Sequence, residues 1–112
     1  MKKLGLVLLA IVVIGLAVLF LPSLHKSQPH SVTLSWRAPE GPANSNVVNF
    51  NIYRGTTLGG PYARVASGVH GLNYKDTAVN GGVTYFYVVR SVDSAGTESP
   101  ASEEIKVTVP GD

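Results

Sequence analysis

The segment spanning residues 85–109 constrains the fold more than any other part of the chain. Aromatic and β-branched residues alternate from Tyr85 onward, a short polar turn containing Gly96 follows, and a second alternating run occupies residues 105–109. Alternation with a period of two indicates a half-buried strand, and two such runs joined by a turn indicate a hairpin. The segment therefore predicts two paired antiparallel strands.

Similar patterns recur upstream. Val32, Leu34 and Trp36 alternate with polar residues, and Phe50 and Ile52 do the same in the run that begins at residue 48. Short strand patterns at residues 62–66 and 72–77 are separated by Gly-, Pro- and Asn-rich turns. Turn signals spaced about 8–12 residues apart are typical of an all-β sandwich.

These motifs together resemble a fibronectin type III domain over about residues 29–110. Residues 50–57 and 59–62 are similar to the third strand and following turn of many bacterial members, and residues 74–77 to their fifth strand. Immunoglobulin domains, the rival sandwich, usually contain an inter-sheet disulfide. This chain has no cysteine, and Trp36 lies on what would be the second strand, as in the fibronectin family.

The resemblance implies an immunoglobulin-like β-sandwich domain over residues 31–110. It also implies structural roles for Trp36 and for Tyr85, the latter as the corner tyrosine whose hydroxyl bonds to the backbone a few residues upstream. Family members usually have a strand before the one that bears the tryptophan. Here either a stub around residues 27–30 supplies it, or the second strand is left as a sheet edge open to pairing.

An apolar run precedes the domain. Residues 4–21 contain no charged or polar side chain, and fourteen of them are Leu, Ile, Val or Phe. As a helix this run would be about 27 Å long, close to the hydrocarbon thickness of a bilayer. Lys2 and Lys3 precede it and favour a cytoplasmic N-terminus. We therefore expect residues 1–3 in the cytoplasm, a transmembrane α-helical signal anchor over residues 4–21, and a tether over residues 22–30.

A cleaved signal peptide is the alternative to an anchor. The run is longer than the usual signal h-region, but Gly15, Leu16 and Ala17 form the small-x-small pattern of a cleavage site. The anchored protein would be a single-pass cell-membrane protein with its domain outside the cytoplasm. The cleaved protein would be secreted.

The charge of the chain is low. The formal net charge is +2, and two of the nine basic residues are the N-terminal lysines, which leaves the domain near neutral. Nucleic-acid binding needs a basic face and is therefore not expected. A monomer is the default expectation because no small-xxx-small pattern marks a helix-dimer face.

No catalytic or metal-binding constellation is expected, and no cofactor. His25, His30 and His70 have neither the spacing nor the cysteine partners of a zinc site, so we expect them to be solvated. Glu103 and Glu104 are neighbours on an expected strand and would point to opposite faces, which excludes a carboxylate pair. The chain is not expected to be an enzyme.

The expected interaction surface is the sheet face opposite the core. If Tyr85, Tyr87 and Val89 point inward, alternation turns their neighbours outward, beside the outward residues of the adjacent strand. The candidate binding face consists of Asn51, Tyr53, Phe86, Val88 and Arg90. We expect a non-catalytic module that binds or scaffolds proteins or glycans of the cell envelope. Ordinary cross-strand pairing would also explain these side chains, and a secreted free module or an accessory module of a separate envelope enzyme are the alternatives.

Overall fold

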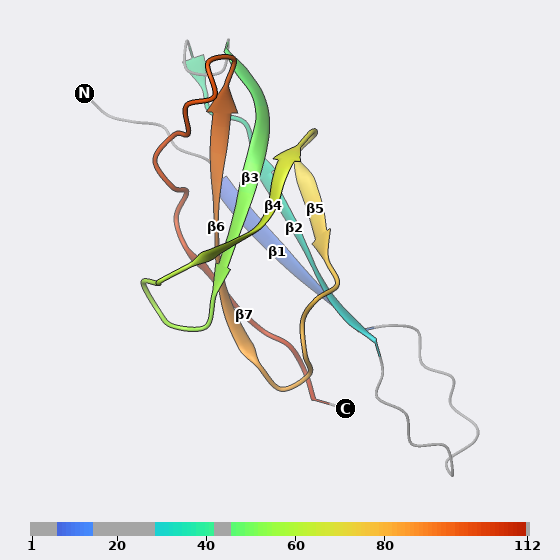
Figure 1. The fold of residues 1–112 in the computed structure, drawn as a ribbon. Helices are drawn as coiled ribbons and strands as arrows, with labels where there is room; N and C mark the ends of the chain where they lie inside the picture. Colours follow the sequence, from blue (N-terminus) through green and yellow to red (C-terminus); the bar gives the residue numbers. More distant parts are fainter. Residues whose placement is uncertain (1–6, 15–28, 42–45, 112) are drawn as a thin grey trace.

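The computed structural model describes residues 7–14, 29–41 and 46–111. Seven β-strands lie within these described ranges (Figure 1). Their bounds are β1 Val7–Ile14, β2 His30–Arg37, β3 Val47–Gly55, β4 Ala63–Val69, β5 Asn73–Asp76, β6 Thr84–Asp93 and β7 Ile105–Thr108.

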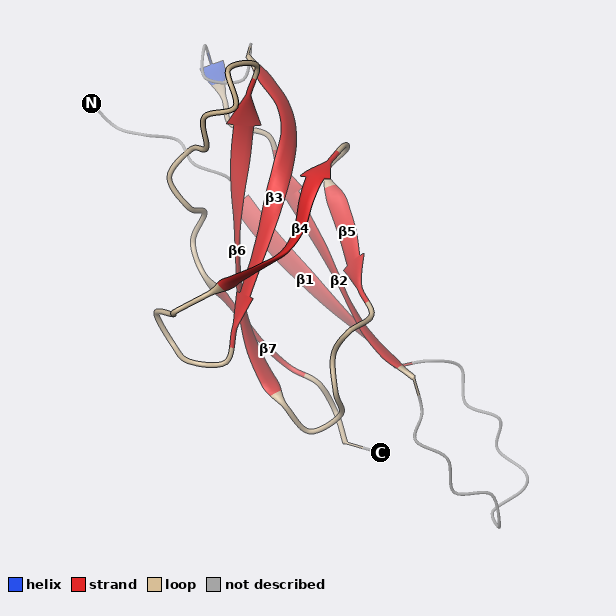
Figure 2. Cartoon of the chain, viewed as in Figure 1, coloured by secondary structure: helices blue, strands red, loops and turns tan. Residues whose placement is uncertain are grey.

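The strands form two sheets that face each other (Figure 2). One has three strands in the order β1-β2-β5, and the other has four strands in the order β4-β3-β6-β7. All the strand pairs are antiparallel. This arrangement confirms the predicted all-β sandwich.

The core lies between the sheets and is filled by the alternating residues of the central strands. Apolar side chains at every second position place one face of each strand away from water. Trp36 contacts Phe50 edge to face, with ring centroids 5.4 Å apart, across the sandwich. The buried residues of this cluster are Val32, Leu34, Trp36, Phe50, Ile52, Val79, Tyr85, Tyr87, Val89, Val107 and Val109.

The first strand comes from an unexpected part of the chain. β1 pairs with β2 over eight residues, from Val7 opposite Arg37 to Ile14 opposite His30. The expectation of a helix over residues 4–21 is therefore wrong for residues 7–14. β1 is the strand that flanks β2, in place of both expected alternatives, a stub around residues 27–30 or an open edge of β2. A run without polar residues has no period, so it cannot by itself distinguish a helix from a buried strand. No helix in the described ranges combines the length and hydropathy that a bilayer crossing requires.

The expected tether also needs correction at its end. His30 was expected to be solvated there, but it opens β2 and is buried, whereas His70 is exposed as expected. His30 is buried because its imidazole lies against the Gly81 backbone, near the Pro110 carbonyl. The expected cytoplasmic residues 1–3, His25 and residues 22–28 of the tether lie outside the described residues.

Candidate functional site on the outer face of the sheet

The outer face of the four-stranded sheet brings the five candidate residues onto two neighbouring strands. In the register of β3 and β6, Asn51 lies opposite Arg90, and Tyr53 lies opposite Val88. Phe86 lies farther along, opposite Gly55. The pairing therefore places these residues side by side, although they are more than thirty positions apart in the sequence.

This face is less open than its sequence suggests. Asn51, Phe86 and Val88 are buried, with exposed fractions of 6%, 7% and 3%. Only Tyr53 and Arg90 of the five are partly exposed. A surface that a partner could touch is thus restricted to these two residues and their neighbours.

A loop between β3 and β4 explains part of this burial. The Tyr62 hydroxyl and the Gly59 backbone N–H both donate to Glu104, which lies in the segment that leads into β7. Phe86 lies on β6 between Gly55 of β3 and Lys106 of β7. The loop is therefore tied across the end of the sheet that carries Phe86, and sequence alternation cannot reveal such a long-range tie.

Glu98 is the residue of this face that the sequence did not reveal. Its Oε2 accepts a 2.6 Å hydrogen bond from Asn51 Nδ2 and a second one from the Tyr53 hydroxyl. The guanidinium of Arg90 lies over the Tyr53 ring, 5.7 Å from its centroid, and donates to the Ser99 carbonyl. We call Asn51, Tyr53, Arg90 and Glu98 the Glu98 cluster.

A turn brings Glu98 back to the sheet. Asp93 Oδ1 accepts hydrogen bonds from the backbone N–H groups of Ala95 and Thr97, and Glu98 then bridges to Val92 of β6. An Asp that starts a Gly-containing turn is a recognisable sequence signal. The signal predicts the turn, but the partners of Glu98 depend on the register of β3 against β6.

The hydrogen bonds of the Glu98 cluster shift two pKa values in opposite directions. The bonds from Tyr53 and then Asn51 hold the pKa of Glu98 below its ordinary value of 4.5. The same bond to Glu98, followed by burial, raises the pKa of Tyr53 above 10.0. Both shifts keep Tyr53 neutral and Glu98 ionised at neutral pH, which is the state in which the bond forms.

We expect Tyr53→Phe to raise the pKa of Glu98 toward 4.5, because the largest cause of its lowering is the Tyr53 hydroxyl. A carboxylate with a lowered folded-state pKa stabilises the fold above its unfolded pKa, and this stabilisation is lost as the pH falls through the folded value. Carboxyl chemical shifts of Glu98 followed by NMR from pH 2 to 7 measure the change. Tyr62→Phe, which removes a hydroxyl from Glu104 instead, is the matched control, and an unchanged Glu98 titration in Tyr53→Phe would contradict the assignment.

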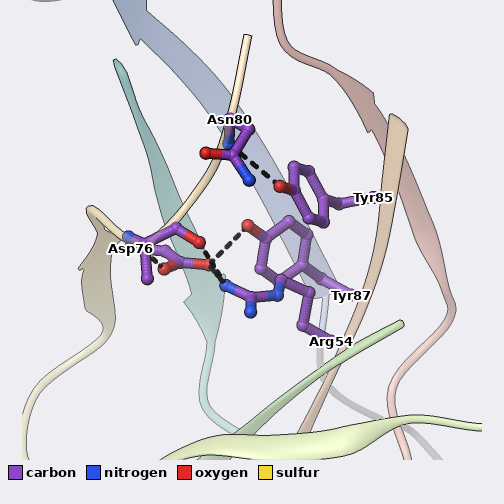
Figure 3. Close-up of polar contacts among 6 residues, drawn as sticks. Arg54, Asp76, Asn80, Tyr85 and Tyr87 are labelled. Carbon is purple, nitrogen blue, oxygen red and sulfur yellow. Dashed lines mark hydrogen bonds and ion pairs between the residues drawn. The ribbon is translucent and has the colours of Figure 1, made fainter. Parts of the chain in front are cut away.

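A second polar cluster joins the two sheets at the buried end of β5 (Figure 3). Asp76 Oδ2 accepts a 2.6 Å hydrogen bond from the Tyr87 hydroxyl and a 2.8 Å charged bond from Arg54 Nη1. Asp76 Oδ1 accepts from the Ala78 backbone N–H at 3.0 Å. Asp76, Arg54 and Tyr87 form the inter-sheet cluster, in which β5 of one sheet is bonded to β3 and β6 of the other.

Burial and hydrogen bonding to Asp76 shift the pKa values of Tyr87 and Arg54 in the inter-sheet cluster. Burial, and then the hydrogen bond to Asp76, raises the pKa of Tyr87, so its hydroxyl stays a donor. Burial alone would lower the pKa of Arg54, but the bond to Asp76 outweighs it and the net shift is upward. Asp76 is only 2% exposed, which leaves it inaccessible to a substrate. The inter-sheet cluster is therefore suited to holding the two sheets together rather than to binding a substrate.

Tyr85 and Trp36 lie beside these contacts. The Tyr85 hydroxyl accepts a 2.9 Å hydrogen bond from the Asn80 backbone N–H, five residues upstream (Figure 3). The Arg54 guanidinium carbon lies over the Tyr85 ring, 5.1 Å from its centroid. Trp36 is buried in the core at 3% exposure. Within the described ranges, no group of three His, Asp or Glu side chains is placed to hold a metal ion.

Comparison with known proteins gives clear relatives. No protein-family model matches the chain. An amylopullulanase of Thermoanaerobacter thermohydrosulfuricus is 41% identical over 75 residues, and exoglucanase B of Cellulomonas fimi is 36% identical over 78 residues. These matches cover 67% and 70% of this chain but only 5% and 6% of the two enzymes.

A solved structure matches over most of its length. The Fn3-like protein from Clostridium thermocellum is 34% identical to this chain, with a TM-score of 0.62 over 71% of this chain and 77% of its own. The match extends to both sequence and fold. The chain therefore belongs to the fibronectin type III family.

Proposed function

We propose that the chain is a non-catalytic interaction module of the cell envelope that contacts a protein or a glycan through Tyr53 and Arg90. The observation that carries this proposal is the geometry of the Glu98 cluster. Glu98 fixes the Tyr53 ring by its hydroxyl, and the Arg90 guanidinium stacks on that ring. Tyr and Arg are enriched at the energetic centres of interfaces, and a side chain that is already fixed loses less entropy on binding.

The relatives favour a glycan as the first ligand to test. The matched segments belong to enzymes named amylopullulanase and exoglucanase, and the chain corresponds to a small part of each. The presence of similar segments in such enzymes also supports a second candidate function, in which this chain is an accessory module of a separate envelope hydrolase. Co-purification of a hydrolase with the native protein would distinguish that role from an independent one.

The location proposed for this module is the outer side of the membrane. Lys2, Lys3 and the apolar run over residues 4–21 favour an attached form with a cytoplasmic N-terminus. Cleavage after Ala17 would instead release a secreted module. The intact mass of the protein from its own host, against the 11.8 kDa of the full chain, distinguishes the two forms.

We expect Arg90→Ala and Tyr53→Ala each to weaken glycan binding by about tenfold or more, as truncation of a central interface residue does. The measurement is affinity electrophoresis of the full chain in mild detergent, in gels containing starch, pullulan or soluble cellulose derivatives. Arg37→Ala is the matched control, because Arg37 is an exposed arginine on a strand of the other sheet. Retardation by a glycan that persists undiminished in both cluster variants would reject this face. Absence of retardation by every glycan would leave a protein as the ligand, to be sought by cross-linking at Tyr53.

A further inference from the structure

β2 lacks the features that protect a natural sheet edge. Three of the outer strands carry an exposed basic residue: Arg64 on β4, Lys75 on β5 and Lys106 on β7. The pairing of β4 with β3 also contains register shifts. Charged residues and irregular pairing are the usual means of preventing edge-to-edge association. Residues 31–36 of β2 contain no charge and no proline, and their pairing with β1 shows no register shift. This strand is built to be paired on both sides.

The direction of its backbone groups identifies which amides depend on β1. Trp36 N–H donates to the Leu72 carbonyl at 3.0 Å, on the side of β5. Backbone N–H groups alternate between the two sides of a strand, so Val32 and Leu34 also donate toward β5. The N–H groups of Ser31, Thr33 and Ser35 therefore face β1.

β1 has an unusual sequence for the strand that flanks a sheet. Its eight residues, VLLAIVVI, include no polar side chain at either set of alternate positions. In a two-layer sandwich one face of each sheet is directed toward water, and an outer strand normally reflects this by alternation. β1 also lies within the apolar run of residues 4–21, whose length suits a bilayer. Its composition fits lipid on all sides better than it fits the edge of a sheet.

We propose that Val7–Ile14 exchanges between β2 and the bilayer, and that its departure opens the edge of β2 to an extended strand from another envelope protein. The inference rests on the membrane attachment proposed above. A helix and a strand cannot form from the same residues at once, so insertion of residues 4–21 removes β1 from the sheet. The amides of Thr33 and Ser35 then lose the strand that they face.

The chemistry of β2 defines the partner. An incoming strand would pair with the backbone groups of Thr33 and Ser35 that face β1, next to the apolar row of Val32, Leu34 and Trp36. Backbone pairing supplies affinity in this mode of recognition, and alternate side chains supply specificity. The partner is therefore an extended, uncharged segment with apolar residues at every second position, which is the chemistry that β1 itself presents.

A disulfide that holds β1 on β2 tests the exchange. Ile11 and Thr33 are directly opposite, at the Cα spacing of about 5.5 Å that suits a disulfide, and the chain has no cysteine of its own. The full chain with Ile11→Cys and Thr33→Cys is floated with vesicles of phosphatidylethanolamine and phosphatidylglycerol, reduced and oxidised. We expect oxidation to lower the membrane-bound fraction by about tenfold, because the closed disulfide prevents the helix.

The control places both cysteines out of register. Ile11→Cys with Ser35→Cys separates the two Cα atoms by about 7–8 Å on the diagonal, too far for a disulfide, so oxidant should change nothing. Failure of the Ile11 and Thr33 cysteines to cross-link would overturn the role of β1. Equal flotation of the oxidised and reduced forms would overturn the exchange alone. Absence of flotation even when reduced would overturn the membrane attachment itself.

Amide exchange tests the vacated edge. In nanodiscs of the same lipids, we expect the Thr33 and Ser35 amides to exchange about tenfold faster or more than in the lipid-free chain, with Val32 and Leu34 little changed. A synthetic peptide that carries the sequence of residues 7–14 between terminal lysines should restore their protection in nanodiscs. It should have no effect on the oxidised, disulfide-bonded protein. Unchanged exchange on insertion, or no protection by the peptide, would overturn the strand-acceptor role of β2.

Discussion

Asp76→Ala is expected to lower the free energy of unfolding by about 3 kcal/mol, the lower part of the range for breaking a buried ion pair. The substitution removes the acceptor of the Tyr87 hydroxyl, which is fully buried, and of the Ala78 backbone N–H. Buried donors left without an acceptor cost their full desolvation energy. Arg54 also loses its counter-ion, but its side chain is 22% exposed and retains access to water, which moderates the loss.

Urea unfolding of the full chain in mild detergent measures this effect through the fluorescence of Trp36, the only tryptophan. Tyr87→Phe removes one hydrogen bond of the same cluster and should cost about 1 kcal/mol. Lys75→Ala, at the exposed neighbouring position of β5, serves as the control and should leave the midpoint almost unchanged. A loss below about 1 kcal/mol in Asp76→Ala would show that the inter-sheet cluster is not an important tie.

Trp36→Ala is expected to lower the free energy of unfolding by about 3–5 kcal/mol, the usual cost of truncating a buried aromatic side chain to alanine. Trp36 is buried in the core and packs edge to face on Phe50 of the opposite sheet. Alanine would leave a cavity between the sheets that the surrounding strands can fill only in part.

Trp36→Phe separates packing from hydrogen bonding at this position. The indole Nε1 is buried without a hydrogen-bond partner in the described structure, so phenylalanine removes an unsatisfied donor while keeping much of the apolar volume. We therefore expect Trp36→Phe to cost less than half as much as Trp36→Ala. Urea unfolding followed by far-ultraviolet circular dichroism measures both, since each variant lacks the tryptophan fluorophore. Equal losses in the two variants would mean that a contact of the indole nitrogen, rather than packing, stabilises this region.

Much of the sandwich could be predicted from local pattern. The alternation at Val32, Leu34 and Trp36, and again at Tyr85, Tyr87 and Val89, matches the buried faces of β2 and β6. A strand places alternate side chains on opposite faces whatever it pairs with, so burial follows from the sequence once one face is apolar. The resemblance to fibronectin type III domains rests on these strands together with the motifs at residues 50–57, 59–62 and 74–77.

The candidate face was only partly predictable. Phe86 and Val88 point away from the core cluster as expected, yet they are buried. Tyr62, Glu104 and Glu98 supply contacts that join positions more than forty residues apart along the chain. No local period encodes such contacts, because they depend on how loops fold over a sheet that is already formed.

Local sequence pattern was enough to predict the strands whose two faces differ, the turns between them and the resemblance to the fibronectin type III family. The strand conformation of Val7–Ile14, the partners of Glu98 and the bonds of Asp76 to Arg54 and Tyr87 depend on long-range contacts in the folded chain. Alternation predicts only which of a strand's own two faces is buried. An all-apolar run carries no such signal, and a buried polar group is defined by the distant residues that satisfy it.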